Sequence, residues 1–186
     1  MSIAGILSEN EEKMAKAVEV TKSDFAGVRT GRASPALVER LRVDYYGTET
    51  PLQQIANISV PENRVLLINV YDKTAVGAVE RTIRESDLGL NPSVDGNVIR
   101  LSFPLLTKER RRQLVKLVKA KSEDSKIVIR NLRRAGREKL ERLEKDSEIS
   151  QDDLRRAEKE LQSVTDKYTG AVDVLLQHKE KELIED

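Results

Sequence analysis

The residues best suited to chemistry in this sequence are basic, and they gather in one segment. Residues 108–145 contain 15 basic and 6 acidic side chains, a formal charge of +9, although the whole chain of 186 residues carries only +1. Seven basic residues follow the spacing of one side of a helix, with Glu123 filling one place in the row. These residues, called the cationic stripe below, are Arg112, Lys116, Lys119, Lys126, Arg130, Arg133 and Arg137. Arg112 lies two residues from apolar Leu114, about 200° around a helix, so the stripe should point away from the core.

Fixed positive charges along a helix predict contact with the phosphates of a nucleic acid. Aromatic residues make up only 3% of the chain, so we do not expect the base stacking that single-strand binders use. The stripe also has no paired side chains that would read a duplex groove. We therefore expect contact with the backbone and shape of folded RNA. The alternative is a solvated face that the acidic segment 146–186, with a formal charge of −6, neutralises.

Other kinds of chemistry have few candidates. The chain has no cysteine, which excludes disulfides and thiolate nucleophiles, and its one histidine, His178, is expected on the surface. It has no G-x-x-x-x-G-K-[ST] loop, so we do not expect it to hydrolyse nucleotides. We predict no catalytic residue, no metal site, no cofactor and no small-molecule substrate. Because we find no membrane-spanning run and no secretory leader, we expect a soluble, cytoplasmic protein.

Long helices must carry the cationic stripe. All five prolines lie within residues 31–107, and proline disrupts helix interiors, so the flanks 1–30 and 108–186 are predicted to be helical. The middle segment should have a different architecture, inserted into the helical one.

The first flank has two possible starting points. Ser8 and Glu11 form a capping-box pattern, but Ile3 and Ile6 would continue the apolar stripe of the helix further upstream. Gly31 is the predicted stop.

The second and third helices each have one apolar stripe. In the second helix the stripe includes the small residues Ser122, Ser125 and Gly136, which would let a neighbouring helix come close. Its members are Leu114, Val118, Ser122, Ser125, Ile129, Leu132, Gly136, Leu140 and Leu143. The third helix should begin at a capping box formed by Ser150 and Asp153. Three such stripes predict an up-down-up bundle.

The middle segment has the pattern of a small α+β module. Alternating residues over 41–45 predict a strand, and Val94–Asn97 has the signal of a hairpin. Pro61–Asn63 is predicted to be a turn. A short helix is predicted over 74–86, with Thr74 as its cap.

These elements predict two domains. The first comprises residues 1–30 and 107–186, and the second comprises residues 31–106. The chain passes between them twice, which predicts a hinge. The hinge candidates are Thr30, Gly31, Arg32, Pro104, Leu105 and Leu106.

Several motifs resemble those of the ribosome recycling factors, in the same order and over essentially the whole chain. They are Thr30-Gly31-Arg32-Ala33-Ser34-Pro35, Tyr45-Tyr46-Gly47-Thr48, Asp87-Leu88-Gly89-Leu90-Asn91-Pro92, Arg130-Asn131-Leu132-Arg133-Arg134, and Ile149-Ser150 with Asp152-Asp153. Gly136 departs from the more polar residue expected in that family.

The resemblance implies an L-shaped α+β fold, in which a three-helix bundle and a small domain meet at a hinge. It also implies that a monomer acts with elongation factor G and GTP after termination, splitting the ribosome and releasing messenger and transfer RNA. The bundle would bind large-subunit ribosomal RNA at the intersubunit face, and the small domain would meet elongation factor G. Arg130 and Arg133 would contact phosphates, and the further RNA-binding candidates are Arg29, Arg32, Arg110, Lys126, Arg134 and Arg137.

Two other kinds of protein fit part of the sequence. A coiled-coil adaptor or an RNA-binding scaffold would explain the helical repeats, although an adaptor would not explain the outward charges. An enzyme acting on RNA has only the charge in its favour.

Overall fold

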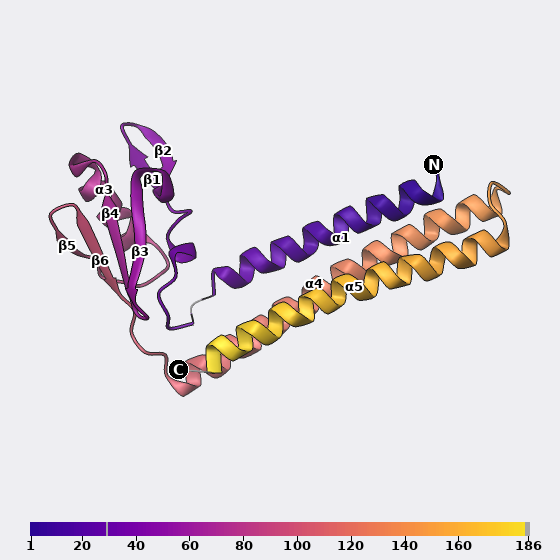
Figure 1. Cartoon of the computed structure of the whole chain (residues 1–186). Helices are drawn as coiled ribbons and strands as arrows, with labels where there is room; N and C mark the ends of the chain where they lie inside the picture. Colours follow the sequence, from indigo (N-terminus) through magenta and orange to yellow (C-terminus); the bar gives the residue numbers. More distant parts are fainter. Residues whose placement is uncertain (29, 185–186) are drawn as a thin grey trace. The chain divides into compact units, whose positions relative to one another are not determined.

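Three long helices form one of the two units of the computed structural model, which describes residues 1–28 and 30–184. This bundle unit comprises Met1–Phe25 and Glu109–Asp186, and the inserted unit comprises Ala26–Lys108. The helices of the bundle are α1 (Ile3–Ala26), α4 (Lys108–Lys145) and α5 (Gln151–Ile184). α4 runs antiparallel to α1 and α5, which gives the predicted up-down-up order (Figure 1).

One apolar cluster holds the bundle together, with contributions from each helix. Its buried members are Ile6, Met14, Ile129, Leu140, Leu143, Ala157, Leu161 and Val172. The predicted stripe of α4 is confirmed, because seven of its nine residues are buried and the other two, Ser125 and Leu132, are half-buried. In α5 the buried residues are Ala157, Leu161, Thr165, Val172 and Leu183.

Helix α1 uses the earlier of its two possible starts. The Gly5 amide donates to Ser2 Oγ at 3.0 Å, and Ile6 is completely buried in the bundle. The capping-box pattern at Ser8 therefore lies inside the helix, because extending the apolar stripe buries one more large side chain. The predicted stop at Gly31 is wrong: α1 ends at Ala26, directly before Gly27, and glycine is about 1 kcal/mol less favourable than alanine in a helix.

The capping box predicted for α5 is confirmed. The Asp153 amide donates to Ser150 Oγ at 3.0 Å, and the Ser150 amide donates to Asp153 Oδ2 at 3.4 Å. The two reciprocal bonds satisfy backbone N–H groups that the first turn of a helix leaves unpaired.

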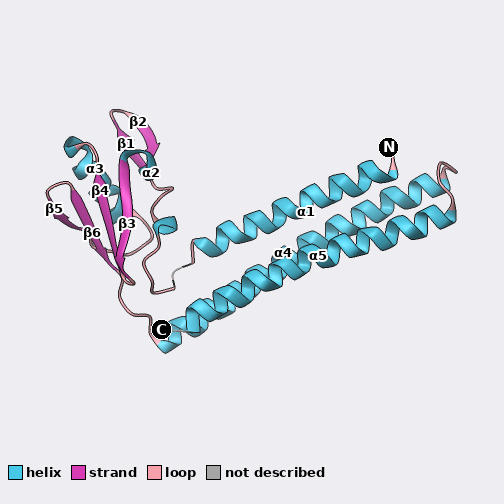
Figure 2. Ribbon diagram, in the orientation of Figure 1, coloured by secondary structure: helices cyan, strands magenta, loops and turns pink. Residues whose placement is uncertain are grey.

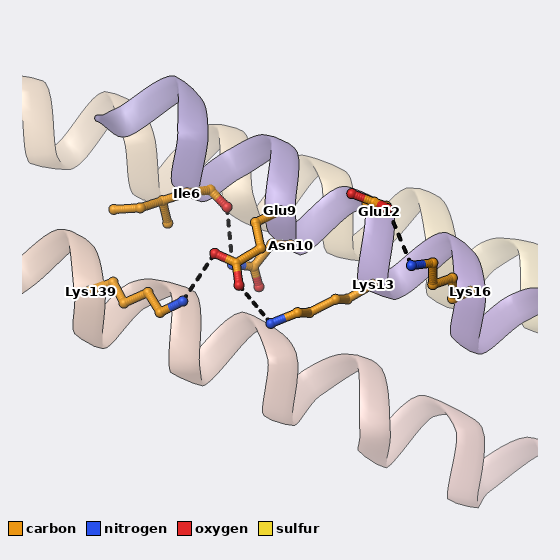
Figure 3. Close-up of polar contacts among 7 residues, drawn as sticks. All are labelled: Ile6, Glu9, Asn10, Glu12, Lys13, Lys16 and Lys139. Atoms are coloured by element: carbon orange, nitrogen blue, oxygen red, sulfur yellow. Dashed lines mark hydrogen bonds and ion pairs between the residues drawn. The ribbon is translucent and has the colours of Figure 1, made fainter. Parts of the chain in front are cut away.

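α1 approaches α4 closely where α4 has the small residue Gly136; Figure 3 shows Asn10 on α1 and the neighbouring Lys139 on α4. Asn10 of α1 is 4% exposed, and a Cβ atom at Gly136 would lie only 2.6 Å from its Nδ2. Glu9 joins the two helices, because it lies 2.7 Å from Lys13 of α1 and 3.1 Å from Lys139 of α4. These hydrogen bonds, above all the one from Lys13, lower the pKa of Glu9.

The inserted unit contains a two-stranded and a four-stranded antiparallel sheet, together with short helices (Figure 2). The four-stranded sheet has the order β3-β4-β6-β5. Its strands are β3 (Ala56–Glu62), β4 (Val65–Val70), β5 (Ser93–Asp95) and β6 (Val98–Ser102). The remaining elements are β1 (Arg42–Tyr45), β2 (Thr48–Pro51), α2 (Leu52–Ile55), α3 (Val76–Glu85) and the 3₁₀ turns Pro35–Leu37 and Lys73–Ala75. The core of this unit contains no residue of the bundle's cluster among the residues that the structure describes.

Two local predictions for the inserted unit are wrong, and one is confirmed. Thr74 does not cap the short helix, because α3 begins after Ala75 without a side-chain cap. Asp72 instead caps the 3₁₀ turn Lys73–Ala75 that precedes α3, by accepting from the Thr74 amide at 2.9 Å. The turn predicted over Pro61–Asn63 is wrong in its bounds, because it begins only at Asn63 and continues to Arg64. Pro61 belongs to β3, where the register shifts between Ser59 and Glu62, so the proline, which has no N–H, can lie in a strand. The hairpin predicted at Val94–Asn97 joins β5 to β6.

No helix in the described part of the chain is both long enough and apolar enough to cross a membrane.

Candidate RNA-binding face

The cationic stripe follows the seam between α4 and α5. Three of its residues pair with acids of α5: Lys119 with Glu180 at 3.6 Å, Lys126 with Asp173, and Arg137 with Glu158 at 3.2 Å. The prediction that the stripe points away from the core is therefore incomplete. Many of its side chains are exposed, but long side chains on the flank of α4 reach the neighbouring helix.

The acids of α5 neutralise part of the stripe. Lys126 has a side chain only 15% exposed, which lies between Asp173 and Glu123. Arg137 donates from Nε to Glu141 at 2.8 Å and to Glu158 at 3.2 Å, and the contact with Glu141 is the largest cause of its raised pKa. The alternative of a neutralised face thus describes these positions correctly.

One turn of α4 remains strongly cationic. Arg130 is 50% exposed, and its Nη1 lies 3.9 Å from a carboxylate oxygen of Glu123. Arg133 donates to the neutral amide oxygen of Gln162 at 2.9 Å. Within the described residues, Arg134 is exposed and has no hydrogen-bond or ion-pair partner.

A cleft of about 360 Å³ opens beside this turn. It is lined by Arg133, Arg134, Arg137, Glu158, Leu161 and Gln162. Guanidinium groups present planar sets of N–H donors that match phosphate oxygens. The cleft can therefore receive an anionic group from a phosphate backbone.

The other predicted RNA-binding residues lie elsewhere. Arg110 is exposed in the first turn of α4 and donates to Gln113 at 3.1 Å. Arg32 is exposed in the inserted unit. Arg29 lies outside the described residues.

The predicted hinge residues lie in the inserted unit, close to the two places where the chain changes unit. Thr30 and Gly31 are buried, and Gly31 has φ +83°, a left-handed conformation that favours glycine. Arg32, Pro104 and Leu105 are exposed, and Leu106 is half-buried.

The residues of α5 that face the stripe were not predicted from the sequence. Glu158, Gln162, Asp173 and Glu180 follow helical spacing along one side of α5, which was the available signal. That spacing does not reveal which residue of α5 meets which residue of α4. His178 is exposed, as predicted.

An up-down-up bundle with an α+β unit inserted after its first helix defines the structural class: a two-unit α+β protein with a cationic helix. The family model described as "Ribosome recycling factor" matches residues 21–184. The chain belongs to the ribosome recycling factor family, which confirms the resemblance in the motifs.

Relatives and solved structures match nearly the whole chain. The ribosome-recycling factor of Streptomyces coelicolor is 53% identical over 179 residues, covering 96% of this chain and 97% of the relative. That of Pseudarthrobacter chlorophenolicus is 55% identical with the same coverage. A solution structure of the ribosome recycling factor is 46% identical, with a TM-score of 0.85, and covers 100% of this chain and 99% of that one.

A second solved structure shows a relative in a larger assembly. It is described as models for the T. thermophilus ribosome recycling factor and the E. coli elongation factor G bound to the E. coli post-termination complex. The matching chain is 42% identical, with a TM-score of 0.71, and the match covers 99% of this chain and 100% of that one. These matches confirm the α+β fold.

Proposed function

We propose that this chain recycles ribosomes after termination. With elongation factor G and GTP, it splits the post-termination complex into subunits and thereby releases messenger and transfer RNA. The observation that carries this proposal is membership of the family over nearly the whole chain, together with the relative that is described on a post-termination complex with elongation factor G.

The bundle unit binds large-subunit ribosomal RNA at the intersubunit face. The proposed contacts are the guanidinium groups of Arg130, Arg133 and Arg134, which lie on one turn beside the arginine-lined cleft. Lys126 and Arg137 contribute less because α5 supplies each with an acid. The motif resemblance adds Arg29, Arg32 and Arg110 as supporting contacts.

The chain itself performs no covalent chemistry in this proposal. Elongation factor G binds the nucleotide and supplies the energy. This protein binds RNA through its bundle unit, and elongation factor G moves its inserted unit. Because the ribosome is its target, we place its activity in the cytoplasm. We also propose that it acts as a monomer.

The two segments near Thr30–Arg32 and Pro104–Leu106 act as the hinge between the units. Since the chain has no native cysteine, one cysteine introduced in each unit allows a specific crosslink. A locked form should still bind the ribosome but should fail to split it. Normal splitting by the locked form would refute the hinge.

The decisive experiment sediments post-termination ribosomes with this protein, elongation factor G and GTP, leaving out each component in turn. Free subunits should appear only with the complete mixture. If ribosomes stay intact in the complete mixture, the proposed function is wrong.

Arg133→Ala tests the RNA-binding face. We expect about tenfold weaker binding to isolated large subunits because one phosphate contact is lost, with an unchanged melting temperature. Arg155→Ala is the matched control, because Arg155 is 76% exposed at the start of α5 and its one ion-pair partner among the described residues is Asp152, at 4.0 Å. If the two variants bind with equal affinity at moderate salt, Arg133 does not contact the RNA.

A further inference from the structure

The α4–α5 seam forms an antiparallel ladder of side-chain pairs, and one rung differs from the others. Between Lys119 and Arg137 of α4, four pairs of polar side chains join the described parts of the two helices. Three of them join a cation of α4 to a carboxylate of α5: Lys119–Glu180, Lys126–Asp173 and Arg137–Glu158. The fourth joins Arg133 to Gln162. Of these four pairs, it alone joins a cation to a neutral group.

The Gln162 amide has one orientation that satisfies both of its neighbours. Its Nε2 donates to Asp166 Oδ1 at 2.8 Å, and its Oε1 accepts from Arg133 Nη1 at 2.9 Å. An ionised carboxylate can only accept hydrogen bonds and a guanidinium can only donate them. The amide nitrogen must therefore face Asp166, and the amide oxygen must face Arg133.

This contact holds Arg133 without cancelling its charge. A guanidinium has five N–H donors, and the bond to Gln162 uses one of them. Arg133 and Gln162 both line the cleft. A carboxylate at position 162 would compete with an incoming phosphate for the same guanidinium, as Glu158 does at Arg137.

We propose that Gln162 is a positioning residue, which holds Arg133 at the cleft with its positive charge available to a phosphate of RNA. Of the four α4 cations in the ladder, Arg133 is therefore the one whose charge no carboxylate of α5 neutralises. This inference rests on the proposed function, because it assumes that the bundle binds ribosomal RNA.

Gln162→Glu tests the proposal, with binding to isolated large subunits measured over a series of salt concentrations. We expect affinity to fall about tenfold and the slope of log affinity against log salt to decrease by about 1, because a carboxylate neutralises Arg133. Gln177→Glu is the matched control: it makes the same change on α5, at an exposed residue whose side chain forms no hydrogen bond or ion pair with another described residue.

Gln162→Ala separates orientation from charge. It removes the tether but adds no carboxylate, so affinity should fall about threefold while the salt slope stays as in wild type. In an Arg133→Ala background, Gln162→Glu should weaken binding no more than Gln177→Glu does. If Gln162 had a purely structural role, Gln162→Glu would lower the melting temperature and leave the salt slope unchanged.

The outcomes separate the inference from the proposed function. If wild type binds large subunits and Gln162→Glu binds them like Gln177→Glu, the inference alone is overturned. The inference is also overturned if Gln162→Glu weakens binding about tenfold in the Arg133→Ala background. If wild type does not bind large subunits, the proposed function fails and the inference fails with it.

Discussion

At the scale of single residues, the close approach of α1 to α4 depends on the missing side chain of Gly136. A Cβ there would meet the buried amide of Asn10, at 2.6 Å from Nδ2. Although alanine is about 1 kcal/mol better than glycine inside a helix, we expect Gly136→Ala to lower the free energy of unfolding by about 1–2 kcal/mol through overpacking. Urea unfolding measures the change.

The control for this prediction removes the amide. In an Asn10→Ala background the clash is absent, so Gly136→Ala should raise the free energy of unfolding by up to ~1 kcal/mol. An equal destabilisation in both backgrounds would show that the contact with Asn10 does not limit the packing.

Asp72 gives a prediction about pH. Its carboxylate accepts hydrogen bonds from Thr74, Tyr46 and Tyr45, and these bonds, the one from the Thr74 side chain first, lower its pKa from 3.8 to about 2. A pKa that is lower in the folded state adds stability above the unfolded value, and this stability is lost as the pH falls through the folded value. Asp72→Asn should therefore lower the melting temperature near neutral pH.

The difference in melting temperature between Asp72→Asn and wild type should shrink as the pH falls from 3.8 to about 2. Thermal unfolding over a pH series measures it. A difference that stays constant across that range would mean that the ionised carboxylate does not provide the stability.

At the scale of elements, the same capping pattern occurs twice, but only one copy caps a helix. Ser150 accepts from the Asp153 amide at 3.0 Å, whereas Ser8 lies inside α1. Ser150→Ala should lower the free energy of unfolding by about 1 kcal/mol. Ser8→Ala is the matched control and should cause no loss, because alanine favours helix interiors. Equal losses would mean that the Ser150 cap adds nothing specific.

Periodicity predicted the elements better than their ends and their partners. It identified the buried stripe of α4 because every third or fourth residue faces one core. It did not decide where α1 begins, because a capping box at Ser8 competed with the burial of Ile6. The capping preference of threonine also predicted a cap at Thr74. In the structure the Thr74 amide instead donates a hydrogen bond to the Asp72 carboxylate, two residues earlier.

The candidate site was predictable only in part, for a similar reason. Arg130 and Arg133 stand out in one helix, since charge and spacing are properties of that helix alone. The contact between Arg133 and Gln162 depends on how far α5 slides along α4, which the stripe of neither helix determines. The sequence of α4 therefore could not show that Lys126 is neutralised by Asp173.

At the scale of the whole molecule, the inserted unit has a core of its own within a continuous stretch of chain. Fully buried residues such as Leu66, Ile68 and Leu101 belong to that core. The segment Ala26–Lys108 should therefore fold alone, since domains of this size commonly do. We expect a cooperative thermal transition by circular dichroism.

Ile68→Ala is the control for the isolated segment. It removes a completely buried side chain and should destabilise the segment by about 2–5 kcal/mol, shifting its transition to lower temperature. A segment without a cooperative transition, or one that is indifferent to Ile68→Ala, would show that this core needs the rest of the chain.

The separate interiors have a consequence for building hybrids. The chain changes unit only at Phe25–Ala26 and at Lys108–Glu109, so the equivalent stretch of a relative can be grafted at these two joints. Each interior would then keep the side chains with which it packs. Poor activity of such a hybrid would point to an incompatible translational partner and not to misfolding, which makes grafts a way to map species compatibility.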